Sequence, residues 1–274
     1  MRIGSKEFAI GEKTYVMGIL NVTPDSFSDG GKYNGLDQAM KHAQEMVDEG
    51  VDIIDVGGES TRPGHVQISD EEEIARVVPV IEELKRTFDI PISVDTYKSG
   101  VASAAVEAGV DLVNDIWGLK YDEKMADVIA KTGAACCLMH NRNDMQYTAF
   151  MQDVLNDLEE TIAIAKKAGI AADKIMLDPG VGFAKTYEMN LEVIKNLADF
   201  NKLGYPVLLG TSRKSVIGLT LDVPADQREE GTQVTTTMAV MSGCSFVRVH
   251  DVLGNKRAIQ MAEAILRSHD LTKA

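Results

Sequence analysis

Residues 51–94 decide the fold, because they read as one complete strand, helix and strand. The unit opens with the apolar run VDIIDV at 51–56 and closes with IPISV at 90–94. The stretch between them repeats apolar residues three and four positions apart, at Ile74, Val77, Val78, Ile81 and Leu84. Short runs that are apolar almost throughout are typical of strands buried on both faces of a parallel sheet. Residues 51–94 therefore predict two parallel strands joined by a helix.

The helix inside this unit carries a start signal and one interruption. Ser69 and Glu72 have the spacing of a capping box, in which each side chain satisfies a backbone N–H of the first turn. Pro79 lies farther along the helix and lacks the N–H that an interior residue donates. We expect the helix to kink or to restart at Pro79.

The same alternation repeats along the whole chain. The predicted strands are Tyr15–Leu20, Val51–Val56, Ile90–Val94, Val110–Asn114, Ala134–Met139, Lys174–Leu177, Pro206–Leu209 and Ser245–Val249. The predicted helices lie around Leu36–Met46, Ile74–Leu84, Ser99–Ala108, Asp122–Lys131, Val154–Ala168, Met189–Leu197 and Val252–Leu266, with a further pair over Lys214–Met241. Eight strands that alternate with about eight helices favour an α/β fold with a parallel sheet.

The length of 274 residues is compatible with two domains or with one barrel. Two doubly wound halves would need a boundary, and the sequence has no Pro/Ser-rich linker or change of composition. We therefore expect residues 1–274 to form a single-domain (β/α)8 TIM barrel. In such barrels the functional site lies at the C-terminal ends of the strands, so polar residues that follow each strand are the candidates.

Charge and cysteine content exclude several classes of partner. The chain has 28 Lys and Arg against 42 Asp and Glu, which gives a net charge of −14 and repels polyanions. We expect no nucleic-acid partner and no membrane partner, although this net charge is compatible with a local cationic pocket. Three cysteines without metal-ligand spacing, and residues 1–13 without the apolar run of a signal peptide, favour a soluble cytoplasmic protein.

The first two strands are followed by loops that suit an anionic ligand. Asn21 ends the first strand and offers an amide oxygen to Mg²⁺, which usually keeps waters and phosphate oxygens as its other ligands. The alternative is that this loop is a cluster of polar turns. Thr61 and Arg62 follow the second strand, where a guanidinium can bind phosphate or carboxylate bidentately. The same residues also occur in ordinary surface loops.

Three other strand ends carry groups that can bind the edge of a heterocycle. Asp95, Asn114 and Asp178 end the third, fourth and sixth strands, and together they present hydrogen-bond donors and acceptors. Each could instead cap the following helix. Phe183, in the loop after Asp178, offers a flat apolar face.

The last two strands bring cations to the same end of the barrel. Lys214 and Ser215 follow the seventh strand in a segment that lacks the second glycine of a nucleotide-binding phosphate loop. Arg248 and His250 fall on one face at the end of the eighth strand. Barrels often bind phosphate after strands seven and eight.

At this point the motifs resemble a known family, the dihydropteroate synthases, over nearly the whole chain. They are 17-MGILNVTPDSFSDGG-31, 58-GESTRPG-64, 94-VDT-96, 113-VND-115, 178-DPGVGF-183, 210-GTSRKS-215 and 248-RVHD-251. The resemblance implies condensation of 6-hydroxymethyl-7,8-dihydropterin diphosphate with 4-aminobenzoate, which releases diphosphate and gives dihydropteroate. It also implies Mg²⁺ as cofactor, a homodimer and inhibition by sulfonamides.

The resemblance also assigns roles to the candidate residues. The pterin ring is expected to bind Asp95, Asn114, Asp178 and Lys214. The diphosphate is expected to bind Asn21 together with Mg²⁺, and Thr61, Arg248 and His250. The 4-aminobenzoate pocket is expected to contain Thr61, Arg62, Phe183 and Ser215. Catalysis is expected to depend on an ionised Asp95, on Arg62 and on Lys214.

Two features depart from the usual pattern of the family, and two other functions remain as alternatives. Ala184 stands where the family often has glycine, and His140 runs into an atypical loop, so His140 receives no role. The alternatives are a methyltetrahydrofolate-dependent methyltransferase of the same barrel superfamily and a non-catalytic pterin-binding paralogue. The methyltransferase would need no group of residues for binding diphosphate.

Overall fold

The computed structural model describes residues 1–23, 32–59 and 66–268. Its centre is a parallel sheet with the order β8-β7-β6-β5-β4-β3-β10-β9. The strands are β3 (Tyr15–Asn21), β4 (Ile53–Gly57), β5 (Ile92–Asp95), β6 (Leu112–Asp115), β7 (Ala135–Met139), β8 (Ile175–Asp178), β9 (Leu208–Leu209) and β10 (Phe246–Val249). A single parallel bridge between Leu177 and Val207 joins β8 to the segment before β9 and closes the ring. The (β/α)8 barrel predicted from the sequence is confirmed.

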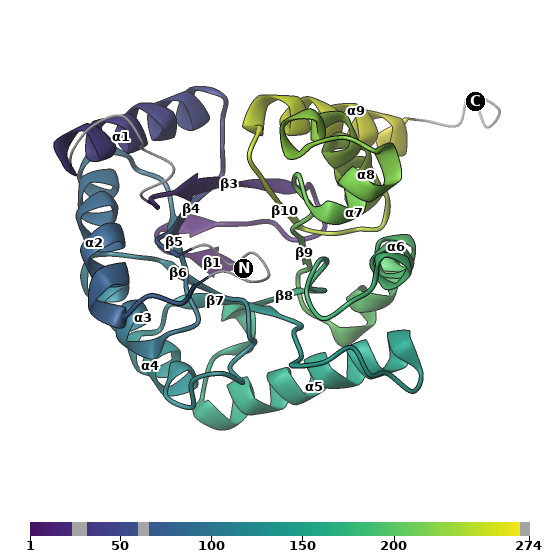
Figure 1. The fold of residues 1–274 in the computed structure, drawn as a ribbon, viewed down its shortest axis with the longest axis horizontal. Coiled ribbons are helices and arrows are strands. Elements are labelled where there is room, and N and C mark those ends of the chain that lie inside the picture. The colour runs from purple at the N-terminus through teal and green to yellow at the C-terminus, as the bar shows by residue number, and fades with distance from the viewer. Residues whose placement is uncertain (24–31, 60–65, 269–274) are drawn as a thin grey trace.

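Helices surround this ring of strands (Figure 1). They are α1 (Lys32–Asp48), α2 (Asp70–Thr87), α3 (Ser99–Glu107), α4 (Met125–Thr132), α5 (Phe150–Ala168), α6 (Tyr187–Lys195), α7 (Ser215–Leu221), α8 (Glu229–Met241) and α9 (Val252–Arg267). The described residues also form the short 3₁₀ helices η2 (Ala172–Lys174), η3 (Leu197–Leu203) and η4 (Ala225–Gln227). None of the helices in the described part of the chain is long and apolar enough to cross a membrane.

Helix α2 shows how its sequence signals are used. The hydroxyl of Ser69 accepts a hydrogen bond from the backbone N–H of Glu72, as the capping box predicts. Of the two outcomes predicted at Pro79, a kink or a restart, the restart is wrong, because α2 continues through Pro79 to Thr87. Pro79 and Ala75 lie on the exposed face, so water can bind the Ala75 carbonyl that has lost its helical donor.

The strands are buried as the continuous apolar runs predict. All five residues of β4 are buried, and one large apolar cluster fills the space between the strands and the helices. Most strands begin one or two residues later than predicted and end one residue later. The later ends place Asn21, Asp95 and Asp178 as the last residues of their strands, where a barrel builds its site.

A short hairpin before the barrel was not predicted. Strands β1 (Arg2–Ile3) and β2 (Lys6–Glu7) pair antiparallel and lead into Phe8. The Phe8 ring lies edge-on to Tyr15 at 4.8 Å between centroids and 5.5 Å from Phe246. Ile3 and Phe8 join an apolar cluster made by the first residues of the strands, such as Leu112. The hairpin therefore closes the amino-terminal end of the barrel, opposite the predicted site.

Candidate active site

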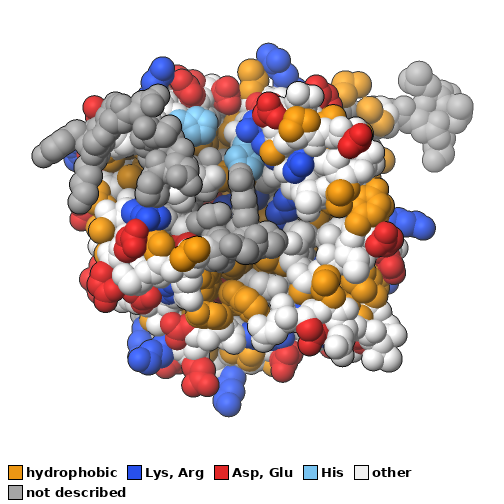
Figure 2. All heavy atoms as spheres, in the orientation of Figure 1, with side chains coloured by type: hydrophobic (Ala, Val, Ile, Leu, Met, Phe, Trp, Pro, Cys, Tyr) orange, Lys and Arg blue, Asp and Glu red, His pale blue; other side chains and the backbone are white. Residues whose placement is uncertain are grey.

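The C-terminal ends of the strands bring most of the predicted residues together. These are Asn21, Asp95, Asn114, Asp178, Phe183, Lys214, Ser215, Arg248 and His250. Thr61 and Arg62, like the loop residues 24–31, lie outside the described residues. In Figure 2, blue Lys and Arg side chains reach the middle of the face shown, whereas red Asp and Glu side chains lie mostly towards its edge.

Arg248 is the centre of the ion pairs in the mouth of the barrel. Its Nε donates to Oδ2 of Asp55 and its Nη2 donates to Oδ2 of Asp95, both at 2.6 Å. Asn114 donates from its amide nitrogen to the same Asp55 oxygen at 3.2 Å. Four residues from four strands, β4, β5, β6 and β10, are therefore linked by charge and hydrogen bonds.

Three buried polar atoms at this place lack a hydrogen-bond partner among the described residues. They are Oδ1 of Asp55, Oδ1 of Asp95 and Oγ of Ser93. An unsatisfied buried acceptor costs free energy unless a ligand, a water or a proton satisfies it. The centre of the mouth is therefore built to receive a hydrogen-bonding group.

Burial changes the acidity of the carboxyl groups in the mouth. It raises the pKa of Asp95 to about 7, although the nearby Arg248 charge opposes the increase and the Asp55 carboxylate adds to it. The sequence-based expectation of an ionised Asp95 therefore becomes a statement about pH, because protonated and ionised Asp95 coexist near neutrality. Burial also raises the pKa of Asp178, against the attraction of Lys214.

Asp178 and Lys214 face each other across the loop that follows β8. Oδ1 of Asp178 accepts from the backbone N–H of Gly180 at 2.7 Å, and Nζ of Lys214 donates to the Val181 carbonyl at 2.5 Å. Burial lowers the pKa of Lys214 to about 8, so the lysine is mostly charged at neutral pH. Carboxylate and ammonium together can bind the donors and acceptors along one edge of a heterocycle.

An apolar surface lies beside these polar groups. The Phe183 ring packs with Tyr97, Ile116 and Met139 in a small cluster at the mouth, and the ammonium of Lys214 lies 4.8 Å from its centroid. An aromatic ring next to an edge-binding site suits a second flat molecule.

The cationic side of the mouth is fixed by the residues after β9 and β10. The Ser212 hydroxyl lies 2.9 Å from Nδ1 of His250 and accepts from the His250 backbone N–H at 3.1 Å. Arg213 has a left-handed φ of 56° and donates to Glu229 at 3.1 Å. Arg213 is therefore tied to α8, whereas Lys214 reaches the loop after β8.

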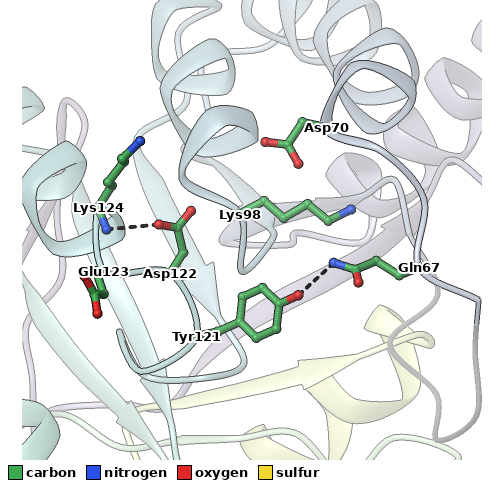
Figure 3. Close-up of a pocket in the computed structure, with 7 residues that line it drawn as sticks. All are labelled: Gln67, Asp70, Lys98, Tyr121, Asp122, Glu123 and Lys124. Atoms are coloured by element: carbon green, nitrogen blue, oxygen red, sulfur yellow. Dashed lines mark hydrogen bonds between the residues drawn. The ribbon is translucent and has the colours of Figure 1, made fainter.

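A second network of charges lies beside the mouth. Nζ of Lys98 donates to Glu59 at 2.5 Å, to Glu73 at 2.8 Å and to the Ile68 carbonyl at 2.7 Å, and Tyr97 donates to Glu59 at 2.6 Å. Next to it is a cavity of about 450 Å³, drawn in Figure 3. It is lined by Gln67, Asp70, Lys98, Tyr121, Asp122, Glu123 and Lys124. None of these belongs to the predicted substrate set.

Sequence reasoning missed two parts of the site. Asp55 received no role, although a charged residue inside the buried run Ile53-Ile54-Asp55-Val56 is itself a signal, since buried carboxylates need partners. The other part is Lys185, a buried residue of the same loop as Phe183. Asp115, in contrast, is structural, because its carboxylate accepts from the backbone N–H groups of Trp117 and Leu119.

Comparison with known proteins identifies the family of this chain. The family model described as pterin binding enzyme matches residues 17–250. A dihydropteroate synthase of Clostridium beijerinckii is 61% identical over 268 residues, which cover 97% of this chain and 100% of that protein.

Solved structures give the same result. The crystal structure of a dihydropteroate synthase from Clostridium difficile in the presence of pteroic acid has a TM-score of 0.93 and 52% identity. The match covers 96% of this chain and 100% of the Clostridium difficile chain. The Yersinia pestis dihydropteroate synthase in a sulfonamide drug complex has a TM-score of 0.91 and 41% identity, and covers 98% and 99% of the two chains. The chain belongs to the family of pterin-binding enzymes and, within it, to the dihydropteroate synthases.

Proposed function

We propose that the mouth of this barrel joins 6-hydroxymethyl-7,8-dihydropterin diphosphate to 4-aminobenzoate, with the residues described above in separate roles. The observation that supports this most strongly is the meeting of Asp95, Asn114, Asp178 and Lys214 around unpartnered buried acceptors. These groups would hold the pterin ring by its polar edge, and burial would make each hydrogen bond strong.

The reaction replaces diphosphate by an amine at the methylene carbon attached to the pterin. Positive charge develops on the pterin as the diphosphate leaves. Ionised Asp95 and the neighbouring Asp55 side chain lie where they would stabilise that charge. The amine of 4-aminobenzoate is weakly basic, so its lone pair is free at neutral pH and no dedicated general base is needed.

Arg248 and His250 would hold the departing diphosphate. A guanidinium has five N–H donors, and the bonds to Asp55 and Asp95 use two of them. Arg248 would thus connect the pterin side of the mouth with the diphosphate side. Thr61 is proposed to contribute a hydroxyl to the diphosphate and to the neighbouring 4-aminobenzoate.

Mg²⁺ fits the donors that the chain offers. No group of three His, Cys, Asp or Glu side chains that could hold a metal occurs in residues 1–23, 32–59 and 66–268. Mg²⁺ commonly takes one or two protein ligands and completes its shell with water and substrate phosphates. The exposed Asn21 side chain at the end of β3 would be such a ligand, and the bound ion would neutralise charge on the diphosphate.

The 4-aminobenzoate pocket is proposed to contain Thr61, Arg62, Phe183 and Ser215. The Phe183 ring would cover the flat face of the aminobenzoate, and Arg62 would pair with its carboxylate. We propose that Arg62 also helps to exclude water, because a cationic pterin that met water would be hydrolysed. Sulfonamides would compete for this pocket.

The remaining proposals concern the whole molecule. We propose that residues 1–274 act as one pterin-binding domain in the cytoplasm, without nucleic-acid or membrane partners. We also propose a homodimer, because α8 and α9 pack side by side and expose large apolar residues. These are Val234, Met238, Met241, Leu253, Met261, Ile265 and Leu266.

The decisive experiment supplies both substrates with Mg²⁺ and follows diphosphate release together with dihydropteroate formation. Release that depends on 4-aminobenzoate supports the proposed reaction. Diphosphate release that ignores 4-aminobenzoate, or no release at all, would contradict it. The second outcome, with tight pterin binding retained, would favour the non-catalytic paralogue, and methyl transfer from methyltetrahydrofolate would favour the methyltransferase.

A further inference from the structure

Lys185 is a buried lysine whose ammonium donates to neutral groups. It lies in the loop between β8 and α6, and 8% of its surface is exposed. Nζ donates to the Gly180 carbonyl at 3.0 Å and to the Phe183 carbonyl at 3.1 Å, and it lies 2.8 Å from Nδ1 of His140. Burial lowers the pKa of Lys185 to about 7, so the ammonium and the neutral amine coexist near neutral pH. The ammonium has three N–H donors, and in that form these three contacts account for all of them.

The contact with His140 has a defined direction. Burial lowers the pKa of His140 to about 4, so its ring is neutral at neutral pH. Nε2 of His140 lies 2.9 Å from Oδ2 of Asp157, which accepts the ring N–H. Nδ1 is then the acceptor that faces Lys185. Arg142 donates to the same Asp157 oxygen at 2.5 Å and fixes the far end of this chain of hydrogen bonds.

The loop folds tightly around the ammonium. Gly180, Gly182 and Ala184 have φ values of 72°, 88° and 45°, and Ala184 adopts this left-handed conformation without the freedom of glycine. A Cβ on Gly180 would lie 2.0 Å from the His140 carbonyl oxygen and 3.3 Å from Nζ of Lys185. The hydroxyl of Tyr147 donates to the Ala184 carbonyl at 2.8 Å. Interactions from the loop between β7 and α5 thus hold a strained backbone in place.

The strained segment is the one that presents Phe183 to the mouth. Asp178 belongs to β8 and is positioned by the sheet, but Phe183 lies in the middle of the loop and its own carbonyl is bound to Lys185. We propose that Lys185 is a positioning residue for 4-aminobenzoate: its ammonium, oriented by His140 and Asp157, fixes the loop 179–186 and with it the Phe183 ring. This inference rests on the proposed role of Phe183 in the aminobenzoate pocket.

The test compares the wild-type enzyme with Lys185→Met, which keeps the length of the side chain and removes all three donors. Hydrogen–deuterium exchange should rise about tenfold or more in residues 179–186, since one or two lost hydrogen bonds correspond to that factor. In steady-state kinetics the KM for 4-aminobenzoate should rise about tenfold, while the Kd for the pterin diphosphate stays within about threefold.

Two further variants separate positioning from stability. Ile81→Ala removes a fully buried side chain from α2 and should lower thermal stability without changing exchange in 179–186 or the KM for 4-aminobenzoate. His140→Leu leaves Lys185 in place but removes the oriented acceptor, and it should shift both readouts in the same direction by a smaller factor. If Lys185→Met does not fold, His140→Leu decides the question.

The outcomes distinguish this proposal from the proposed function. Unchanged exchange in 179–186 would show that Lys185 does not fix the loop. Raised exchange with an unchanged KM, or an equal loss of pterin diphosphate affinity, would overturn its role in positioning for 4-aminobenzoate. If the wild-type enzyme lacks aminobenzoate-dependent turnover, the proposed function fails. The exchange data then still decide whether Lys185 fixes the loop, and the positioning role falls with the function.

Discussion

Arg248 and Asp95 form an ion pair of 2.6 Å inside the barrel, although they are separated by more than half of the chain. The pair joins β10, which carries a proposed diphosphate ligand, to β5, which carries a proposed pterin ligand. The two halves of the first substrate would therefore meet groups that are already in contact. Protonation of Asp95 should therefore affect the groups on both the pterin side and the diphosphate side of the mouth.

The first prediction concerns pH. The pKa of Asp95 is raised to about 7, so kcat/KM for the pterin diphosphate should rise with pH as the stabilising carboxylate forms. The midpoint of this rise should lie near pH 7, with a plateau above it. Asp95→Asn should lose this dependence and about 10²-fold to 10³-fold in kcat/KM. Initial rates from pH 5 to 8 measure it. Asp115→Asn is the matched control, since its buried carboxyl serves the backbone, and it should keep the midpoint.

The raised pKa of Asp95 also makes the folding stability depend on pH. Between about pH 4 and pH 7 the folded protein keeps the Asp95 proton and the unfolded chain has lost it, so folding stability falls as the pH rises through this range. Urea unfolding at several pH values should show a flatter profile for Asp95→Asn than for the wild-type protein. A steeper profile in the variant would contradict the assignment.

The second prediction is the cost of removing Arg248. Arg248→Met leaves the carboxylates of Asp55 and Asp95 buried without their cation, and it should lower the free energy of unfolding by about 3–5 kcal/mol near pH 8. The loss should shrink at pH 5, where Asp95 is protonated. Urea titrations at both pH values measure this. The exposed Arg257→Met is the control and should stay within about 0.5 kcal/mol of the wild-type protein.

The third prediction tests recognition of the pterin edge. Asp178→Ala removes a buried carboxylate at the end of β8 and should weaken pterin binding about 100-fold or more, because hydrogen bonds to charged groups are strong and its neighbours lose their partner. Calorimetry with a pterin that lacks diphosphate measures the loss. The exposed Asp173→Ala should bind normally. Unchanged pterin affinity in Asp178→Ala would show that the edge is bound elsewhere.

The fourth prediction concerns Mg²⁺. Asn21→Ala should raise the Mg²⁺ concentration needed for half-maximal rate about tenfold, and excess Mg²⁺ should restore the rate. Activity titrations after removal of divalent ions by a chelator measure this. Binding of a pterin without diphosphate should not change in the variant. If Asn21→Ala reaches its half-maximal rate at the same Mg²⁺ concentration as the wild-type protein, Asn21 is not a ligand of the metal.

The fifth prediction concerns assembly. Val234→Glu combined with Met261→Glu places charges on the apolar residues of α8 and α9 and should convert the proposed dimer to a folded monomer. Sedimentation equilibrium gives the mass, and circular dichroism checks the fold. Met145→Glu, which alters an exposed methionine in the loop before α5, should leave the mass unchanged.

Much of this fold could be predicted because a buried parallel strand leaves a simple pattern. Runs such as Tyr15–Leu20 and Ala135–Met139 are apolar for their whole length, and the helices between the strands repeat at helical spacing. The hairpin before Phe8 left no such pattern, because two-residue strands are too short for any periodicity. The restart predicted at Pro79 was wrong because the sequence does not say that this face of the helix meets solvent.

The site divides in the same way. Strand ends are readable from the sequence, so Asp95, Asn114 and Asp178 could be placed before any coordinates. Lys185 could not, because two of its three partners are main-chain carbonyls, and those are the same at every position of the chain. Asp55 could have been found, since a carboxylate inside a buried strand must have a cation or a proton.

The closure of the barrel has a consequence for how the enzyme holds its ring of strands together. Between β8 and β9 the sheet has one bridge, Leu177 to Val207, and the proposed pterin ligands Asp178 and Lys214 stand on the two sides of this seam. Nζ of Lys214 already crosses the seam to the Val181 carbonyl. A pterin bound by both residues would add a second link across the junction between β8 and β9, where a single bridge joins the strands. Pterin binding would then also stabilise the closed barrel.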